Sequence, residues 1–315
     1  QTSCPIVFWH FSPKIPIFAV EKNNIMPKKI FQRIATMAAM ATLPLTAAAI
    51  APGEACFADE ATDTATITRM LSQAERLDLR IPNARMAALG RMLLDTPYAA
   101  GTLEGDTECL RIDMQRMDCT TFVENVAAMA ITIGEGRSSW HDMVYNLERL
   151  RYRQGHLDGY PSRLHYISDW IIDNAHRGTL TDVTPRIVAT PSYQIKTLDF
   201  ITRNRDKYPA LADSARFEAM KNMEIGFRSH RFPYIKTSAV DKADILEGDI
   251  IAIVTKTPGL DVQHIGIATR GTDGKIHLLH ASSATGKVIV DPLPLATYLQ
   301  RQRSIQGIRV VRLNE

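Results

Sequence analysis

The stretch DCTTFVENVAAMA, residues 118–130, decides the fold, because it places a cysteine at the start of a predicted helix. Apolar side chains recur at helical spacing after Cys119, and GEG at 134–136 is typical of a helix end. The apolar face that this spacing predicts consists of Phe122, Val126, Met129, Ala130 and Ile133. We therefore expect an amphipathic helix that begins at a thiol.

The position of Cys119 favours a reactive sulfur. The first turn of a helix has unpaired backbone amides and about half a positive charge, which together stabilise an anion. Such a site can lower the pKa of a cysteine, and the neighbouring amides can bind a developing oxyanion. The alternative is that Cys119 is simply a small buried residue, a common fate of cysteine. A neighbouring imidazole would decide between the two, because a nucleophilic thiol usually needs a base.

The rest of the chain changes from helical to strand patterns. Residues 64–95 predict two helices broken near Pro82. From residue 245 onward the segments GDIIAIVT, QHIGIAT, KIHLLHAS and KVIVDPL alternate with turn sequences, which predicts an antiparallel strand series. Helices followed by antiparallel strands indicate an α+β domain.

Two histidines in the strand region are candidates for the base. If residues 271–273 form a three-residue hairpin loop, paired residue numbers sum to 544, and His264 lies directly opposite His280 on one sheet face. A two-residue turn at Asp273 and Gly274 would instead send the two imidazoles to opposite faces. We prefer the first register, because it leaves Ile265 and Ile267 together on the other face.

A metal site is the competing interpretation of these three residues. Cys119, His264 and His280 resemble an open zinc site with one sulfur and two imidazole ligands. The sequence has no CxxC or HExxH cluster, which argues against zinc. We therefore expect neither a metal nor another cofactor.

The N-terminal segment predicts export. Residues 26–33 are basic and residues 34–51 form an uncharged, Ala-rich run, the order of a secretory signal, with cleavage expected after Ala58. A single membrane anchor is the alternative, but Pro44 and the weak hydrophobicity of the run disfavour it, so no membrane span is expected after signal removal. Residues 1–25 precede the first methionine and are predicted to be upstream sequence.

Three further expectations follow from this cleavage. Cys56 is not expected to carry a lipid, because no aliphatic residue stands three positions before it. Removing residues 1–58 takes away five of the 37 basic and two of the 34 acidic residues and leaves 32 of each. This balance, without basic runs, argues against nucleic acid as a partner. Cys109 and Cys119 then remain, and a disulfide between them is not expected, because it would silence the thiol.

The motifs together resemble a known family. The order PY, DCTTFVE, QHIGIA and LLHASS resembles the NlpC/p60 superfamily of papain-like cell-wall cysteine hydrolases. A longer match, taking in GTLEGD, GYPSRLHYISDW, LEGDIIAIVT and GKVIVDPLPLATYL, is similar to the branch described as N-acetylmuramoyl-L-alanine amidase-like and covers roughly residues 87–310. Thr121 stands where many superfamily members have glycine, which is compatible with this branch.

The resemblance implies a fold and a domain layout. The implied fold is a papain-like core, in which the nucleophile helix packs on an antiparallel sheet. Residues 59–315 are then one catalytic domain, with N-terminal helices at 59–95 and a helical and loop insertion at 137–240 that shapes the cleft.

The resemblance also implies the chemistry. Cys119 attacks a peptide-type carbonyl, His264 serves as base and then acid, and His280 orients the His264 ring. The Cys119 amide and the Tyr98 hydroxyl assist at the oxyanion. The substrate is peptidoglycan or a muropeptide, cut between N-acetylmuramic acid and L-alanine, and family habit favours the periplasm. Two alternatives stay open: an endopeptidase cutting the γ-D-glutamyl-diamino acid bond of the stem peptide, and a catalytically silent wall-binding module.

Four residues of the 137–240 segment are candidates for substrate contacts. Arg163, His165, Tyr166 and Trp170 lie near one predicted helix start, and an arginine can hold a stem-peptide carboxylate with two hydrogen bonds. The alternative is that the aromatic pair packs in a core and that the arginine faces solvent.

Overall fold

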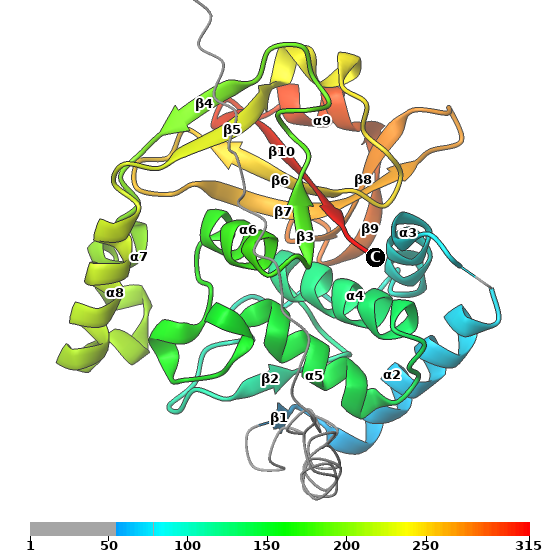
Figure 1. Ribbon diagram of the computed structural model, residues 1–315, viewed down its shortest axis with the longest axis horizontal. Helices are drawn as coiled ribbons and strands as arrows, with labels where there is room; N and C mark the ends of the chain where they lie inside the picture. The colour runs from blue at the N-terminus through cyan, green and yellow to red at the C-terminus, as the bar shows by residue number, and fades with distance from the viewer. Residues whose placement is uncertain (1–54, 78) are drawn as a thin grey trace, which may run out of the picture. The chain divides into compact units, whose positions relative to one another are not determined.

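The computed structural model describes residues 55–77 and 79–315, all of which belong to one unit of the chain, residues 49–315 (Figure 1). The predictions for residues 1–25 and for most of the signal segment therefore lie outside the described residues. The described part has a mixed α/β fold, in which one antiparallel sheet packs against a layer of helices.

An eight-stranded sheet forms one layer of the described part, in the order β4-β5-β10-β6-β7-β8-β9, with β3 paired to β10. Every strand pair in it is antiparallel, which confirms the predicted strand series. The strands are β3 (Leu180–Asp182), β4 (Ser192–Ile195), β5 (Arg231–Lys236), β6 (Ile250–Thr255), β7 (Val262–Arg270), β8 (Ile276–Ser282), β9 (Lys287–Pro294) and β10 (Ile305–Leu313).

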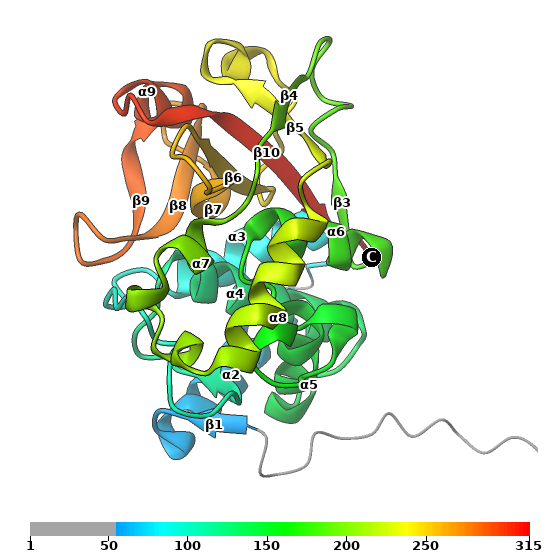
Figure 2. The same ribbon diagram turned by 90° about the vertical axis from the view of Figure 1, so that its left-hand side faces the viewer.

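Helices cover both faces of this sheet. Figures 1 and 2 both show the main helical layer on one side of it, and α9 near its other face. The main layer comprises α2 (Glu60–Glu75), α3 (Pro82–Met92), α4 (Cys119–Gly134), α5 (Trp140–Arg151) and α6 (Ile167–His176). The opposite face packs against α9 (Leu295–Gln300) and the 3-10 helix η5 (Thr237–Lys242). The break between α2 and α3 at Pro82 confirms the predicted pair of N-terminal helices.

The helix α4 begins at Cys119 and ends at Gly134, as expected, but it is not amphipathic. Its residues from Thr121 to Ala130 are all buried, including Glu124 and Asn125. Helices α2, α3 and α5 and strands β7 and β8 pack around it, so it lies at the centre of the larger core. A helix that is buried all round needs no polar stripe, and this is why the expected solvent face is missing.

The segment 137–240 is more than an insertion. Residues of α5 and α6 belong to the same core as α4, and β3 and β5 pair with the central strand β10. The part with a hydrophobic cluster of its own is centred on α7 (Phe200–Arg203) and α8 (Ser214–Gly226). The remaining short 3-10 helices of the segment are η1 (Arg153–Gly155), η2 (Tyr160–Ser162), η3 (Arg205–Lys207) and η4 (Pro209–Ala212). The strands of this segment are short and lie among polar residues, so the sequence shows no alternation of apolar and polar residues that would have predicted them.

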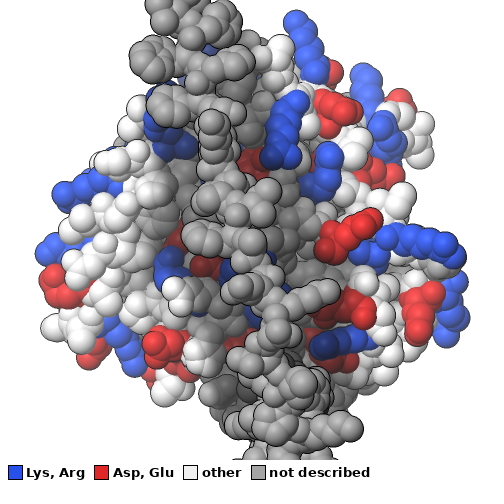
Figure 3. Space-filling model, in the orientation of Figure 1, with Lys and Arg blue, Asp and Glu red and all other residues white. Residues whose placement is uncertain are grey.

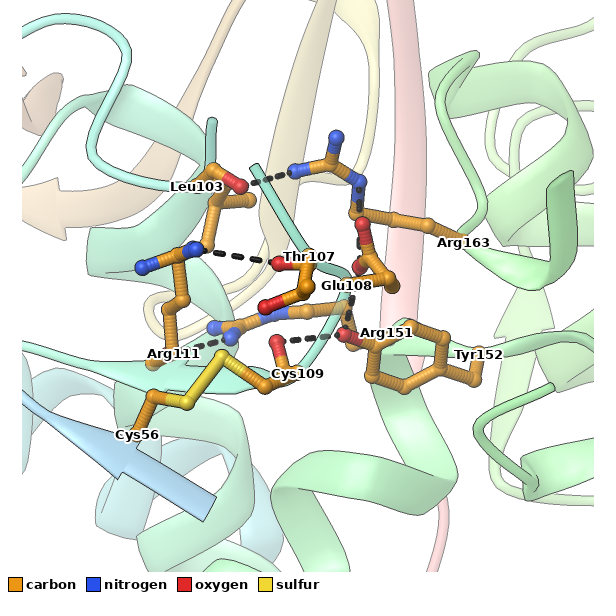
Figure 4. The surroundings of a disulfide bond; sticks show 9 residues. All are labelled: Cys56, Leu103, Thr107, Glu108, Cys109, Arg111, Arg151, Tyr152 and Arg163. Atoms are coloured by element: carbon orange, nitrogen blue, oxygen red, sulfur yellow. Dashed lines mark hydrogen bonds and ion pairs between the residues drawn. A yellow bond between two sulfur atoms is a disulfide. The ribbon is translucent and has the colours of Figure 1, made fainter. Parts of the chain in front are cut away.

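A disulfide joins the start of the described chain to the fold. Cys56, in β1 (Ala55–Phe57), bonds to Cys109, just before β2 (Leu110–Ile112), and the two strands pair in parallel (Figure 4). The Ala58 amide also donates to the Ile112 carbonyl. Cleavage after Ala58 would remove β1 and half of the disulfide, so the structure argues against that boundary. Cys119 is free, as expected. Cys109 forms its disulfide with Cys56, a cysteine that the expected cleavage would have removed.

Removing this disulfide should cost stability without changing the site. A Cys56→Ser/Cys109→Ser variant is expected to lose about 2–4 kcal/mol in free energy of unfolding, because the bond closes a long loop of the unfolded chain. Urea unfolding measures the loss, and wild-type protein treated with a phosphine reductant should lose the same amount. An unchanged urea midpoint in both samples would show that the two cysteines are not bonded in solution.

Candidate active site

The start of α4 is fixed by a reciprocal cap around the cysteine. The Asp118 carboxylate accepts hydrogen bonds from the Thr120 amide at 3.0 Å and the Thr121 amide at 2.8 Å. The Thr121 hydroxyl accepts in turn from the Asp118 amide at 3.0 Å. This capping box stabilises the helix from its first residue, and none of its hydrogen bonds uses the Cys119 amide. It explains why the sequence places an acidic residue directly before the thiol.

The thiol does not have the lowered pKa that its helix position suggested. Burial, and then the negative charge of Asp118, raise the pKa of Cys119 to about 11. Hydrogen bonds from the Ile265 amide and the Thr120 hydroxyl stabilise the thiolate and only partly offset this rise in pKa. The cap that starts the helix thus opposes the helix dipole at the sulfur. At neutral pH the resting group is a neutral thiol, so a nucleophile forms only when a base removes its proton.

This state of the thiol predicts a simple pH dependence. Because the neutral form persists below a pKa of about 11, alkylation of Cys119 by iodoacetamide should be slow at pH 7. The rate should then rise roughly tenfold per pH unit toward the thiolate plateau. Mass spectrometry of the modified cysteine measures the rate, with a short cysteine peptide as the control. A rate that is fast and flat between pH 6 and 9 would instead indicate a preformed thiolate.

The two histidines meet as predicted, although in a different register. In the β7–β8 hairpin paired residue numbers sum to 546, as in Ile267 opposite Leu279, and not to 544. The loop has the expected three residues but lies one residue later, at 272–274, since the Gly271 amide donates to the Lys275 carbonyl. Both sums are even, so His264 and His280 still share one face, and they meet diagonally. His264 Nε2 lies 2.6 Å from His280 Nδ1, which is a direct hydrogen bond.

Both imidazoles are held neutral. Burial lowers the pKa of His264 to about 3, with a further lowering by His280, and burial lowers the pKa of His280 to about 4. A neutral His264 can accept a proton, which a base requires. The thiol accepts from the amide of Ile265, so the sulfur lies beside the residue that follows His264. Among the described residues no hydrogen bond joins the thiol to His264 in this resting arrangement.

Two tyrosines lie close enough to Cys119 for its charge to shift their pKa, and only one of them was predicted. Burial first, and then the charges of Cys119 and Asp118, raise the pKa of Tyr98. The segment around Tyr98 is fixed by bonds between its amide and the Gly286 carbonyl and between the Ala99 amide and the Met117 carbonyl. Tyr298 of α9 was missed: burial, Asp291 and Cys119 raise its pKa. Tyr298 lies in the segment GKVIVDPLPLATYL of the family match, but nothing in that segment assigned the tyrosine a role at the site.

Three of the predicted substrate contacts have internal partners instead. The side chain of Arg163 is 4 % exposed and donates to the Leu103 carbonyl at 2.7 Å (Figure 4). It also donates to the Glu104 carboxylate at 2.8 Å. His165 Nε2 lies 2.9 Å from the Tyr160 carbonyl, and the buried Tyr166 hydroxyl donates to Glu224. Trp170 is buried as well. These residues hold the fold together, and the structure argues against substrate contacts at all four.

Arg163 anchors the loop that leads to the thiol. Its charge faces Glu104 and also Glu108, whose carboxylate lies 3.6 Å from Arg163 Nε and accepts from the Tyr152 hydroxyl (Figure 4). Glu108 precedes the disulfide residue Cys109, so one cluster ties residues 103–109 to the chain near α6. We expected Arg163 to bind a carboxylate of the substrate, but Glu104 and Glu108 of the chain itself are its acidic partners.

Replacing Arg163 should therefore cost stability. Arg163→Met leaves a buried carboxylate unpaired and is expected to lower the free energy of unfolding by about 3 kcal/mol. Arg116→Met is the matched control, because the ion pair of Arg116 with Asp113 is exposed and its loss should cost under about 1 kcal/mol. Urea unfolding separates the two variants. Unchanged stability together with a raised KM would instead support the interpretation of Arg163 as a substrate contact.

Three properties of the described residues bear on partners. No group of three or more His, Cys, Asp or Glu side chains in residues 55–77 and 79–315 is arranged to hold a metal ion. No helix in the same part of the chain is long and apolar enough to span a membrane. On the face seen in Figure 3, basic and acidic side chains are interspersed.

Similar proteins have the same architecture. A mixed α/β fold that brings a cysteine at a helix start close to a hydrogen-bonded histidine pair is compatible with a hydrolase. Residues 88–308 match the AmiA-like family, described as N-acetylmuramoyl-L-alanine amidase-like. The chain therefore belongs to this family of amidase-like peptidoglycan hydrolases.

Solved structures agree with the family match. The chain is 38% identical to an N-acetylmuramoyl-L-alanine amidase from Bacteroides uniformis ATCC 8492, with a TM-score of 0.70, covering 74% of this chain and 99% of that one. It is 41% identical to a putative xylanase from Bacteroides fragilis, with a TM-score of 0.66 and 71% and 98% covered. A Legionella pneumophila protein shares the fold at 21% identity and a TM-score of 0.63, with 81% and 96% covered. A search of curated proteins found no match.

Proposed function

We propose that the chain is an exported cysteine hydrolase that cuts the amide between N-acetylmuramic acid and L-alanine in peptidoglycan or its fragments. In this proposal its core is papain-like and belongs to the NlpC/p60 superfamily. The observation that carries the proposal is the hydrogen bond between His264 and His280, close to Cys119 at the capped start of α4. The amidase named among the similar structures supports the choice of bond.

The proposed reaction has two steps. His264 takes the thiol proton as the Cys119 sulfur attacks the lactyl carbonyl of the muramic acid, and the Cys119 amide and the Tyr98 hydroxyl bind the oxyanion. The C–N bond then breaks, and His264 returns the proton to the amino group of L-alanine. In the second step a water attacks the thioester, with His264 again as base, and the free thiol is restored. Because the resting thiol is neutral, proton transfer and attack are coupled.

The alternatives are distinguished by their chemistry. An endopeptidase would use the same residues on a γ-D-glutamyl carbonyl, and a silent wall-binding module would use none of them. A xylanase needs two carboxylic groups flanking a glycosidic bond. Near the thiol the structure has Asp118, whose Oδ1 accepts the helix-cap bonds, and Asp291 behind His280. This pairing does not favour glycoside cleavage.

Digestion of a defined disaccharide-tetrapeptide, followed by mass spectrometry, tests the choice of bond. The proposal expects an intact peptide with a free L-alanine amino group and a peptide-free disaccharide. A disaccharide that still carries one or two amino acids would point to the endopeptidase, and new reducing ends from xylan would point to the glycosidase. Undigested substrate with bound protein would leave only the wall-binding module.

Export is supported by the disulfide between Cys56 and Cys109, because such bonds form and persist in oxidising compartments. We propose a periplasmic location. Cell fractionation with a free-thiol assay tests this placement: a cytoplasmic protein with three reactive thiols in residues 55–315 would contradict it.

A further inference from the structure

The outer nitrogen of His280 has no hydrogen-bond partner. His280 Nε2 is buried and unbonded, although the other ring nitrogen bonds to His264 at 2.6 Å. The nearest charged group is the Asp291 carboxylate on the neighbouring strand β9, with Oδ2 at 3.8 Å from His280 Nε2. The side chains of His280 and Asp291 are only 3 % and 14 % exposed, so water does not easily replace this contact. A buried polar atom of this kind needs an explanation, and a role in the site is one of them.

Asp291 is held in place for this contact. Its Oδ1 accepts from the Leu293 amide at 2.9 Å, which leaves Oδ2 directed at the imidazole. Its backbone carbonyl lies 2.8 Å from His277 Nδ1, which fixes the strand around it. The ring of Tyr298 packs edge-on against His280, with centroids 5.8 Å apart, and limits rotation of the imidazole. The side chain of Asp291 therefore cannot turn away without losing a backbone bond.

Asp291, His280 and His264 form a row, and the carboxylate of Asp291 determines which ring nitrogens in this row carry a proton. A carboxylate only accepts hydrogen bonds, so it favours a proton on His280 Nε2. A neutral His280 then has a lone pair on Nδ1, and His264 must donate to it from Nε2. A neutral His264 with its proton on Nε2 has its lone pair on Nδ1. That nitrogen is the one left free to act as a base.

We propose that Asp291 is a positioning residue, which selects through His280 the tautomer that leaves His264 Nδ1 unprotonated. The proposal rests on the proposed function for its catalytic meaning, but the tautomers can be observed without any activity. Asp291 touches no reacting atom. Its carboxylate also stabilises the positive charge that the histidine pair gains when the thiol proton is transferred.

Nitrogen NMR of the imidazoles tests the proposal directly. In uniformly ¹⁵N-labelled wild-type protein, both His264 and His280 are expected to carry their proton on Nε2 at pH 7. A coupling across the N–H···N bond should link His264 Nε2 to His280 Nδ1. His280→Gln and His264→Gln samples assign the signals. A proton on His280 Nδ1 in the wild-type protein would overturn the proposal, whether or not the protein hydrolyses muropeptides.

The variant Asp291→Asn should reverse the proton positions on the His280 and His264 rings. If the asparagine oxygen keeps the Leu293 amide bond, the asparagine NH₂ group faces His280 and favours its other tautomer. The expected result is a proton on His280 Nδ1 and a kcat lowered at least ~10-fold with KM nearly unchanged. Unchanged tautomers in a folded variant would contradict the proposal. A lowered kcat with unchanged tautomers would do the same.

Asp95→Asn is the matched control. It removes a carboxylate that lies 2.6 Å from Lys287 Nζ, at the start of the strand β9 that carries Asp291, and its partner is a lysine and not a histidine. This variant should keep both the wild-type tautomers of His264 and His280 and the wild-type kcat. If the wild-type protein shows no hydrolysis of muropeptides at all, the proposed function fails, while the tautomer assignment is still decided by the spectra.

Discussion

Replacing Cys119 by alanine should lower kcat for muropeptide hydrolysis by about 10⁴-fold or more, because loss of a nucleophile costs about this much or more in enzymes whose catalytic residues act as a unit. Alanine fits the space of a cysteine at the first residue of α4, and the Asp118 cap does not involve the sulfur. The free energy of unfolding should therefore change by no more than about 1 kcal/mol. Substrate binding should persist, so KM or the Kd of an uncleaved muropeptide should be nearly unchanged.

The matched control for Cys119→Ala changes cysteines elsewhere. The Cys56→Ser/Cys109→Ser variant loses stability but should keep kcat near the wild-type value at temperatures well below its unfolding. Activity is followed by chromatography of the released peptide. A Cys119→Ala protein that still hydrolyses the substrate at more than about a tenth of the wild-type rate would return the thiol to a purely structural interpretation.

Replacing His264 by glutamine should lower kcat/KM by about 10²- to 10⁴-fold, the usual contribution of a general acid–base group. Glutamine can still donate a hydrogen bond toward His280, so the fold of the hairpin should survive. It cannot take the proton from a thiol whose pKa is about 11. The loss should therefore be larger than for an enzyme with a preformed thiolate, and raising the pH should restore part of the rate.

His156→Gln is the control for this variant, because its side chain is 73% exposed and its contact is with Glu148 on α5. It should leave both activity and stability unchanged. Steady-state kinetics between pH 6 and 10 measure both variants. A His264→Gln protein with a wild-type rate and pH profile would show that another group accepts the thiol proton.

The local parts of the site could be predicted from the sequence. The start of α4 at Cys119, the strands that carry His264 and His280, and their shared face all follow from patterns within about twenty residues. The parity of the hairpin was right although its register was shifted by two residues, because side-chain direction in a strand depends only on even or odd separation. The direct hydrogen bond between the imidazoles depends on that parity.

What could not be predicted depends on distant contacts. Strand β10 enters the middle of the sheet from the end of the chain, and Tyr298 and Asp291 reach the site from the segments just before it. The direction of the pKa shift at Cys119 depends on burial that no local pattern reveals. The pairing of Cys56 with Cys109 spans 53 residues and crosses the expected signal boundary. The internal partners of Arg163 lie about 60 residues away along the chain.

The central claim is that the Cys119 sulfur forms a bond to the muramic acid carbonyl. Acid quenching of the enzyme during rapid turnover of a defined muropeptide, followed by proteolysis and mass spectrometry, measures this most directly. The account predicts a muramoyl thioester on the peptide that contains Cys119, and no peptide-derived acyl group there. A covalent adduct on any other residue, or an undiminished turnover rate after complete alkylation of Cys119, would contradict it.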